Sequence, residues 1–189
     1  MSVLDGGFAD PARDGARSFR AVLEAMARPG TEVMPEPARG PAPLSPAAAA
    51  VLLTLVDGDT PLHLAGAHDC EAVRRWIAFH CAAPLVAAEE AVFALGCWDA
   101  LLPLDRFAIG TPDYPDRSAT LIVDDPAAGR PVTLSGPGIR GTAAARLPDP
   151  AAFAANHDRF PLGWDAILAC GARLMAVPRS TAVLPQEAV

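Results

Sequence analysis

The glycine-rich stretch LSGPGIRG, residues 134–141, has residue types and spacing that suggest chemistry. Gly136, Gly138 and Gly141 match the G-x-G-x-x-G spacing of a dinucleotide-binding loop, and the preceding RPVTL is typical of a strand. Such a loop opens a helix and donates backbone N–H groups to phosphate. Here the TAAARLPDP that follows is too short for a crossover helix, and Pro137 removes one donor. A structural turn that ends a strand is therefore favoured, with a nucleotide loop as the alternative.

Polar side chains elsewhere give three further candidates. Asp57, Asp59 and Thr60 form a polar turn before an expected strand, where carboxylates can line a site, although turn chemistry alone also explains them. His80 falls on the apolar face of an expected helix, which is typical of a core or interface histidine and leaves acid–base chemistry as the alternative. Arg179 follows an apolar strand, so it is either a solvated strand end or an anion-binding group.

The basic residues limit the chemistry more sharply than any motif. All 15 are arginine, and the chain contains no lysine. A lysine Schiff base to pyridoxal phosphate and a Walker-type lysine on a nucleotide phosphate are both excluded. If the chain binds a phosphate or phosphonate, arginine must supply the charge, and its planar fork suits such anions. Arg179 is the first candidate for this role and Arg20 the second.

Charge and hydrophobicity exclude several classes of partner. The net charge is −7 and the arginines are scattered, so we expect no nucleic-acid binding. The longest apolar run, LSPAAAAVLLTLV, predicts a buried helix and no membrane span. The N-terminal residues show no secretory pattern, which predicts a cytoplasmic protein with reduced thiols. The four cysteines form no C-x-x-C pair, and we expect neither a metal site nor a cofactor.

Residues 14–28 predict an amphipathic helix, supported by an Arg20–Glu24 pair one turn apart and closed by Pro29 and Gly30. Apolar residues at i, i+3, i+4 and i+7 form the expected core-facing stripe. The stripe consists of Phe19, Val22, Leu23 and Met26.

Two more helices are expected after a proline-rich connector at residues 35–46. Ser45 can cap the first, with Pro46 at its opening position, and the apolar run continues to Asp57. Asp69 can cap the second, CEAVRRWIAFHC, whose apolar stripe includes Trp76 and His80. Trp76 is also a candidate anchor for a partner protein, with core packing as the alternative.

Short apolar runs over the rest of the chain predict strands. They are PLHLAG, PLVAA, AVFALG, SATLIVDD and RPVTLSG. Near the end, WDAILAC and RLMAVPRS flank a Gly-Ala pair, and they fit either a hairpin or a helix followed by a strand. Helices early and strands later predict an α/β fold with a mixed sheet, as one domain over residues 1–189. No self-sufficient catalytic motif is present in the sequence.

Taken together, several segments resemble the PhnH family, whose members are subunits of the bacterial carbon–phosphorus lyase system for phosphonate use. The resemblance covers residues 7–183 and rests on segments in the family's order. These are SFRAVLEAMARPGT, VLLTLVDGDTPLHL, FHCAAPLV, GTPDYPDRSATLIV, VTLSGPGIRG and RFPLGWDAILACGARLMAVPRSTAV.

The resemblance implies a fold like that of the pyridoxal-phosphate-dependent transferases, but without the cofactor, and a homodimer. It also implies a core complex with three other subunits. That machinery couples an alkylphosphonate to C1 of the ribose of ATP and displaces adenine, and a radical enzyme of the core later breaks the carbon–phosphorus bond. We therefore predict a subunit without activity of its own, which meets phosphonate and ATP, if at all, at a shared site. A stand-alone nucleotide- or anion-binding enzyme that uses residues 134–141 is the alternative.

The resemblance carries over no catalytic residue. It marks recurrent positions that serve folding, docking or ligand contact: Asp59, Thr60, Pro61, His80, Gly136, Gly138, Pro161, Gly163 and Arg179. Among these, the candidate binding residues are Arg179, Asp59, Thr60 and His80, to which Arg20 is added for its charge.

Overall fold

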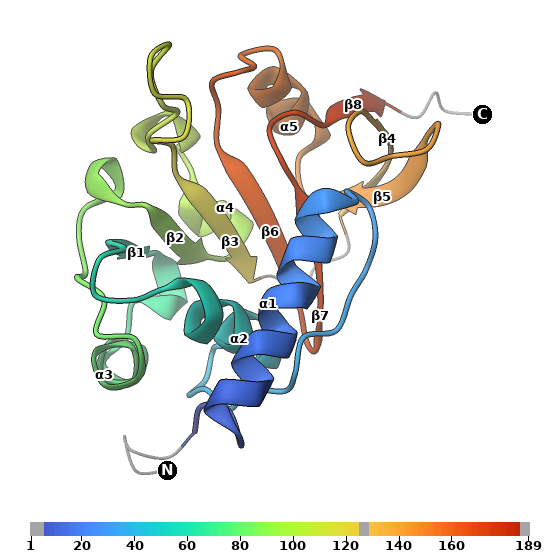
Figure 1. The fold of residues 1–189 in the computed structure, drawn as a ribbon. Helices are drawn as coiled ribbons and strands as arrows, with labels where there is room; N and C mark the ends of the chain where they lie inside the picture. The colour runs from blue at the N-terminus through green and yellow to red at the C-terminus, as the bar shows by residue number, and fades with distance from the viewer. Residues whose placement is uncertain (1–5, 125–128, 186–189) are drawn as a thin grey trace.

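The computed structural model describes residues 6–124 and 129–185, which form five α-helices, three short 3-10 helices and eight strands within those ranges (Figure 1). The helices are α1 (Pro11–Ala27), α2 (Pro46–Leu55), α3 (Glu71–His80), α4 (Trp98–Leu101) and α5 (Pro150–His157). The strands are β1 (Leu62–Leu64), β2 (Phe93–Gly96), β3 (Thr120–Asp124), β4 (Arg130–Ser135), β5 (Ala143–Leu147), β6 (Asp165–Cys170), β7 (Arg173–Val177) and β8 (Ala182–Pro185).

The main sheet has five strands in the order β1-β2-β3-β6-β7. The first four are parallel, and β7 returns antiparallel to β6 as a hairpin. A second, antiparallel sheet has the order β5-β4-β8. The predicted α/β class and mixed sheet are therefore confirmed, and the final pair of apolar segments, WDAILAC and RLMAVPRS, forms the hairpin β6–β7.

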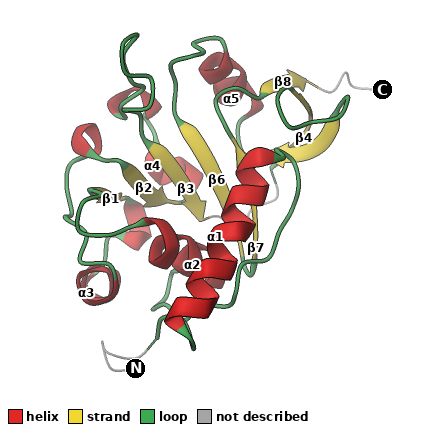
Figure 2. Cartoon of the chain, viewed as in Figure 1, coloured by secondary structure: helices red, strands yellow, loops and turns green. Residues whose placement is uncertain are grey.

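Helices cover both faces of the main sheet (Figure 2). Alternate residues of a strand point to opposite faces, so Ile122 of β3 packs in one core while Leu121 and Val123 pack in the other. The first core contains buried residues of α1, α2 and α3. The second contains residues of α4 and α5 together with the inner face of the smaller sheet. The fold thus has three layers, with the main sheet as the middle one.

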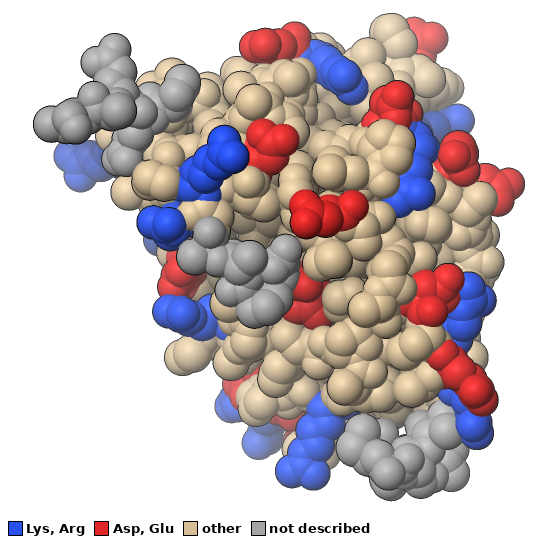
Figure 3. Space-filling model, turned by 180° about the vertical axis from the view of Figure 1, so that it is seen from behind, with Lys and Arg blue, Asp and Glu red and all other residues tan. Residues whose placement is uncertain are grey.

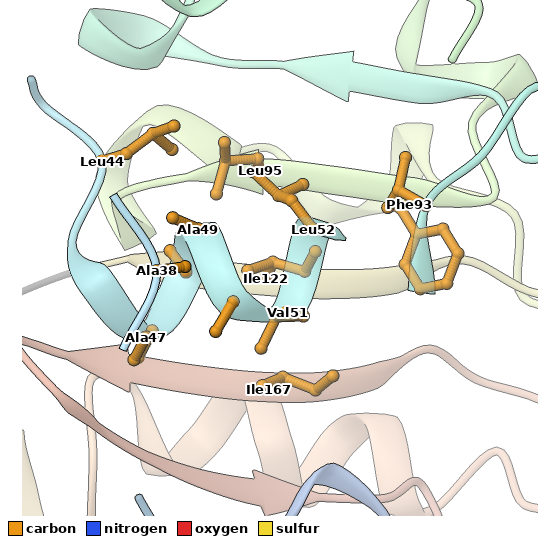
Figure 4. Packing of buried hydrophobic residues seen from close by; sticks show 14 of the residues in the cluster. Ala38, Leu44, Ala47, Ala49, Val51, Leu52, Phe93, Leu95, Ile122 and Ile167 are labelled. Carbon is orange, nitrogen blue, oxygen red and sulfur yellow. The ribbon is translucent and has the colours of Figure 1, made fainter. Parts of the chain in front are cut away.

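Helix α2 lies in the middle of the first core, where Val51 and Leu52 pack near Leu95 and Ile122 (Figure 4). Its residues 47–52 are all buried, which explains why its sequence is apolar on every side. As predicted, Ser45 is the N-cap, because its Oγ accepts the N–H of Ala48 at 3.1 Å and Pro46 follows at the first helical position. The helix ends at Leu55, two residues before the predicted end.

The orientation of α1 differs from the prediction. Val22 is buried and Met26 is partly buried against the core, but Phe19 and Leu23 are 50% and 55% exposed. The buried face is centred on Ser18, Val22 and Ala25, which lie at i, i+4 and i+7. Two of these are small, so the helix can approach α2 and β7 closely and leaves half of its apolar stripe outside.

Two predicted local contacts are also replaced. Glu24 pairs with Arg28 at 2.9 Å rather than with Arg20. The N-cap of α3 is Cys70, not Asp69, and Asp69 instead accepts hydrogen bonds from Arg74. In both cases an arginine near the carboxylate offers a charge-assisted bond, which is stronger than a neutral one.

Candidate functional site

The glycine stretch 134–141 connects two antiparallel strands, β4 and β5, and does not open a helix. Gly138 has a φ of +80°, and a Cβ there would overlap the carbonyl oxygen of Ala27 at the end of α1. The turn therefore packs tightly against the C-terminus of α1. This geometry supports the structural interpretation, since the loop lacks the helix N-terminus that a dinucleotide site requires.

Arg179 lies just beyond the end of β7 and is held by groups of its own chain. Its Nε and Nη2 donate to Oδ1 and Oδ2 of Asp165 at 3.1 and 2.6 Å, and its backbone N–H donates to Oδ1 at 2.8 Å. Its Nη1 donates to the Pro115 carbonyl at 2.6 Å, and Nη2 also donates to Ser118. Four of the five guanidinium N–H groups are thus engaged.

This network limits what Arg179 can do. The side chains of Arg179 and Asp165 are only 13% and 17% exposed. The planar fork that would grip a phosphonate already holds the Asp165 carboxylate, which also neutralises its charge. An incoming anion would have to displace that carboxylate, so the observed arrangement joins β6, β7 and the 115–118 loop and does not present an open anion site.

The segment that leads into Asp165 is fixed in a similar way. Asn156 of α5 donates to the Trp164 carbonyl at 2.8 Å and accepts the Trp164 N–H at 3.0 Å. Gly163, at φ +127°, packs against the same amide, which would lie 2.7 Å from an added Cβ. The distinctive PLGWD sequence therefore has a structural explanation: it positions Trp164 in the core and Asp165 beside Arg179.

The other candidate residues lie apart from Arg179. Asp59 and Thr60 precede β1, at the opposite end of the main sheet from β6 and β7. The backbone N–H of Asp57 donates to Thr60 Oγ1 at 2.7 Å, and that of Asp59 to Asp57 Oδ1 at 2.9 Å. These bonds are the turn chemistry that the sequence allowed.

His80 ends α3, packs on Trp76 and Phe79, and lies beside Gly7. Burial lowers its pKa below the ordinary value for histidine. Trp76 is 2% exposed, so the proposed role as a surface anchor is wrong and the core interpretation holds. Arg20 is exposed on α1 and has no ion pair among the residues that the structure describes. The five candidates therefore form no common site.

A buried histidine–carboxylate pair was not predicted from the sequence. His68 Nε2 lies 3.1 Å from Asp124 Oδ2, and both side chains are 5% exposed. The same oxygen accepts the N–H of Ser45, the N-cap of α2, at 2.9 Å. The pair therefore joins the loop after β1 and the end of β3 to the N-terminus of α2.

His68 and Asp124 follow or end strands at the carboxyl edge of the parallel sheet, where α/β proteins usually bind ligands. Here both groups are buried, and neither lines any of three hollows, of about 380, 370 and 130 Å³, that the described residues form. The evident consequence is structural, since the pair fixes α2 on the sheet. The polar end of an apolar strand, IVDD, was the only sequence signal for it.

Residues 6–124 and 129–185 contain neither a candidate metal-binding cluster nor a candidate membrane-spanning helix. No three histidine, cysteine, aspartate or glutamate side chains there come together in a way that could hold a metal ion. None of the helices there is long and apolar enough to cross a membrane. On the face shown in Figure 3, acidic and basic side chains are interspersed, in keeping with the scattered arginines of the sequence.

The fold is that of a three-layer α/β protein, in which the Arg179 guanidinium and the Asp57–Thr60 turn are engaged by hydrogen bonds within the chain. The family model described as bacterial phosphonate metabolism protein (PhnH) matches residues 6–184. The chain is also 39% identical to the alpha-D-ribose 1-methylphosphonate 5-triphosphate synthase subunit PhnH of Rhizobium meliloti (strain 1021), over 95% of this chain and 94% of that protein. The chain therefore belongs to the PhnH family.

Proposed function

We propose that this protein is the PhnH subunit of a synthase that forms α-D-ribose 1-alkylphosphonate 5-triphosphate from ATP and an alkylphosphonate. The observation that carries the proposal is the 39% identity, over nearly the full length of both chains, to a protein named as a subunit of that synthase. Its role is to support the transfer of ribose to the phosphonate within a complex, in bacterial phosphonate catabolism.

The proposed subunit has no turnover of its own. Support comes from the polar groups: Arg179 is engaged by Asp165, His68 and Asp124 are buried, and the Asp57–Thr60 turn satisfies itself. A catalytic site for ribosyl transfer needs groups that face the substrate and are free to bind or move a proton. We infer that the other subunits of the synthase supply them.

The test is an assay of the purified chain with ATP and methylphosphonate, alone and after addition of the other subunits. Released adenine is the measured product. We expect none from the chain alone, and adenine release by the complete set that is lost when this chain is omitted. Turnover by the isolated chain, or an undiminished rate without it, would contradict the proposal.

A homodimer, a cytoplasmic location and a likeness to the pyridoxal-phosphate-dependent transferases are finer parts of the proposal. The mixed sheet with helices on both faces is compatible with such a likeness, and the absence of lysine fits a member of that class without its cofactor. Ultracentrifugation over a hundredfold range of concentration tests the dimer, because mass action makes its population depend on concentration.

The alternative, a stand-alone nucleotide enzyme, retains one supporting feature, the exposed Arg140 in the glycine turn. Calorimetry with millimolar ATP tests it, with Arg140→Ala as the variant. Gly138→Asp is unsuitable, because any side chain at that position disturbs the packing on Ala27. Heat of binding that Arg140→Ala abolishes would favour the alternative.

A further inference from the structure

The outward face of α1 carries an apolar stripe that no described part of the chain covers. We name it the α1 stripe: Ala12, Ala16, Phe19, Leu23 and Ala27, all exposed. The spacing of these residues by three or four places them along one side of the helix. The opposite, buried side packs on α2 and β7, and nothing is drawn in front of α1 in Figure 1.

The two large side chains of the α1 stripe are unusually open for their type. Phe19 and Leu23 lie one turn apart and are 50% and 55% exposed, so they form one continuous apolar patch rather than isolated surface residues. Complete burial of each side chain in a partner would favour binding, because burial of large apolar side chains contributes much of the binding free energy in protein interfaces.

The charges around the α1 stripe indicate what kind of surface covers it. Residues 11–28 carry four arginines and two acidic residues, although the whole chain has a net charge of −7. Arg17 pairs with Glu36 and Arg28 with Glu24. Arg13 and Arg20 are exposed and make no ion pair with any residue in the described ranges. The apolar patch is therefore bordered by positive charge that no residue in the ranges 6–124 and 129–185 neutralises.

A second copy of this chain matches the patch poorly. In a symmetric dimer the same surface lies on both sides of the contact, so two positively charged helices would meet. A surface with apolar side chains bordered by carboxylates complements the α1 stripe better, both in contact and in charge.

We propose that the α1 stripe docks α1 into an apolar groove, rimmed by aspartate or glutamate, on a different subunit of the synthase. This inference rests on the proposed function and specifies which surface of the chain performs it. An amphipathic helix that lays its apolar side into a groove is a common mode of recognition, with anchors at i and i+4 as Phe19 and Leu23 are here.

The test measures affinity by titration. The purified full chain is added to the subcomplex formed by the other subunits of its synthase. The double variant Phe19→Ser/Leu23→Ser should weaken binding at least tenfold without lowering the Tm, because both side chains are half exposed in the free chain. Arg20→Glu should also weaken binding, and added salt should reduce the difference between Arg20→Glu and the wild type.

Phe160→Ser is the matched control, since Phe160 is 57% exposed and lies after α5, away from α1. It should leave the affinity unchanged. If the wild-type chain binds none of the other subunits, the proposed function fails. If it binds them and the double variant binds equally well, the α1 stripe is wrong and the proposed function stands. If the double variant dissociates a dimer and still joins the complex, the stripe is a contact between copies and the proposal is overturned.

Discussion

Arg179 and Asp165 are joined by three hydrogen bonds, two from the guanidinium and one from the Arg179 backbone N–H, at 2.6 to 3.1 Å. Asp165 is the first residue of β6, and Arg179 lies just beyond the end of β7. The pair therefore joins the two strands at the open end of their hairpin. Because both side chains are mostly buried, each depends on the other for compensation of its charge.

Loss of this compensation should destabilise the fold. We expect Asp165→Asn to lower the free energy of unfolding by about 3 kcal/mol, because it leaves a largely buried guanidinium without its counter-charge. In a chain of this size that corresponds to a Tm lower by roughly 6–12 °C. Arg179→Lys should also destabilise, since an ammonium group cannot reach Asp165, Ser118 and the Pro115 carbonyl together. Urea unfolding measures both.

Glu32→Gln is the control for that experiment. It removes an ion pair with Arg173 whose side chains are 62% and 61% exposed, so the free energy of unfolding should change little. An Asp165→Asn protein as stable as the wild type would mean that the Arg179 network does not support the fold, and it would return Arg179 to the list of candidate substrate contacts.

The glycines of the β4–β5 turn offer a second prediction. Gly138 and Gly141 share nearly the same backbone angle, with φ of +80° and +76°, but only Gly138 touches another element. Gly141→Ala should cost about 1 kcal/mol through backbone strain alone. Gly138→Ala should cost at least about 2 kcal/mol more, because its methyl group must push the end of α1 away from the turn. Equal losses in thermal unfolding would contradict the packing role.

Local signals predicted the parts of this fold that depend on neighbours in sequence. Ser45 followed by Pro46 marked the start of α2 correctly, and the buried stripe of α3 includes Trp76 as expected. The face of α1 could not be predicted, because periodicity shows where apolar residues lie but not which of them the rest of the chain covers. Small residues at positions 18 and 25 set that choice.

The polar clusters show the same limit. The register of the β6–β7 hairpin places Asp165 close to Arg179. The hairpin was one of two alternatives for these segments, and it implies this contact. His68 and Asp124 are different, because they meet only through the order of the strands in the sheet. Nothing within either segment of the sequence indicates the other, and a contact of this kind needs the tertiary fold.

The four cysteines should differ widely in reactivity. Burial raises the pKa of the Cys81 thiol to about 12, and its Sγ lies 3.9 Å from the Leu52 carbonyl oxygen inside the first core. Cys170 is exposed at the β6–β7 turn. At pH 8 a disulfide reagent such as dithiobis-nitrobenzoate should modify Cys170 first, because the thiolate is the reactive species.

Cys81 should react only after denaturant is added. Cys170→Ser is the control, since it should remove the fast phase of the reaction and leave the rest unchanged. Fast modification of Cys81 in the folded chain would show that the first core opens readily around α2 and α3, contrary to the dense packing seen there.

His80 should make stability depend on pH in a defined window. Burial lowers its pKa in the folded chain, while in the unfolded chain the pKa is close to the ordinary 6.5. Between these two values the unfolded chain binds more protons, so stability rises with pH. The contribution is complete above about pH 6.5 and is lost as the pH falls toward the folded-state pKa.

The variant His80→Phe keeps a ring against Trp76 and Phe79 but removes the titration. Urea unfolding at pH 5, 6 and 7.5 should give a smaller rise in the free energy of unfolding for this variant than for the wild type. Asp69, whose pKa is lowered by its hydrogen bonds from Arg74, loses its contribution only at more acidic pH and does not interfere. Equal slopes in the two proteins would mean that His80 is as well hydrated in the folded chain as in the unfolded one. The contact of His80 with Gly7 would then open in solution, since in the structure that contact and the neighbouring rings leave Nε2 buried and without a hydrogen-bond partner among the described residues.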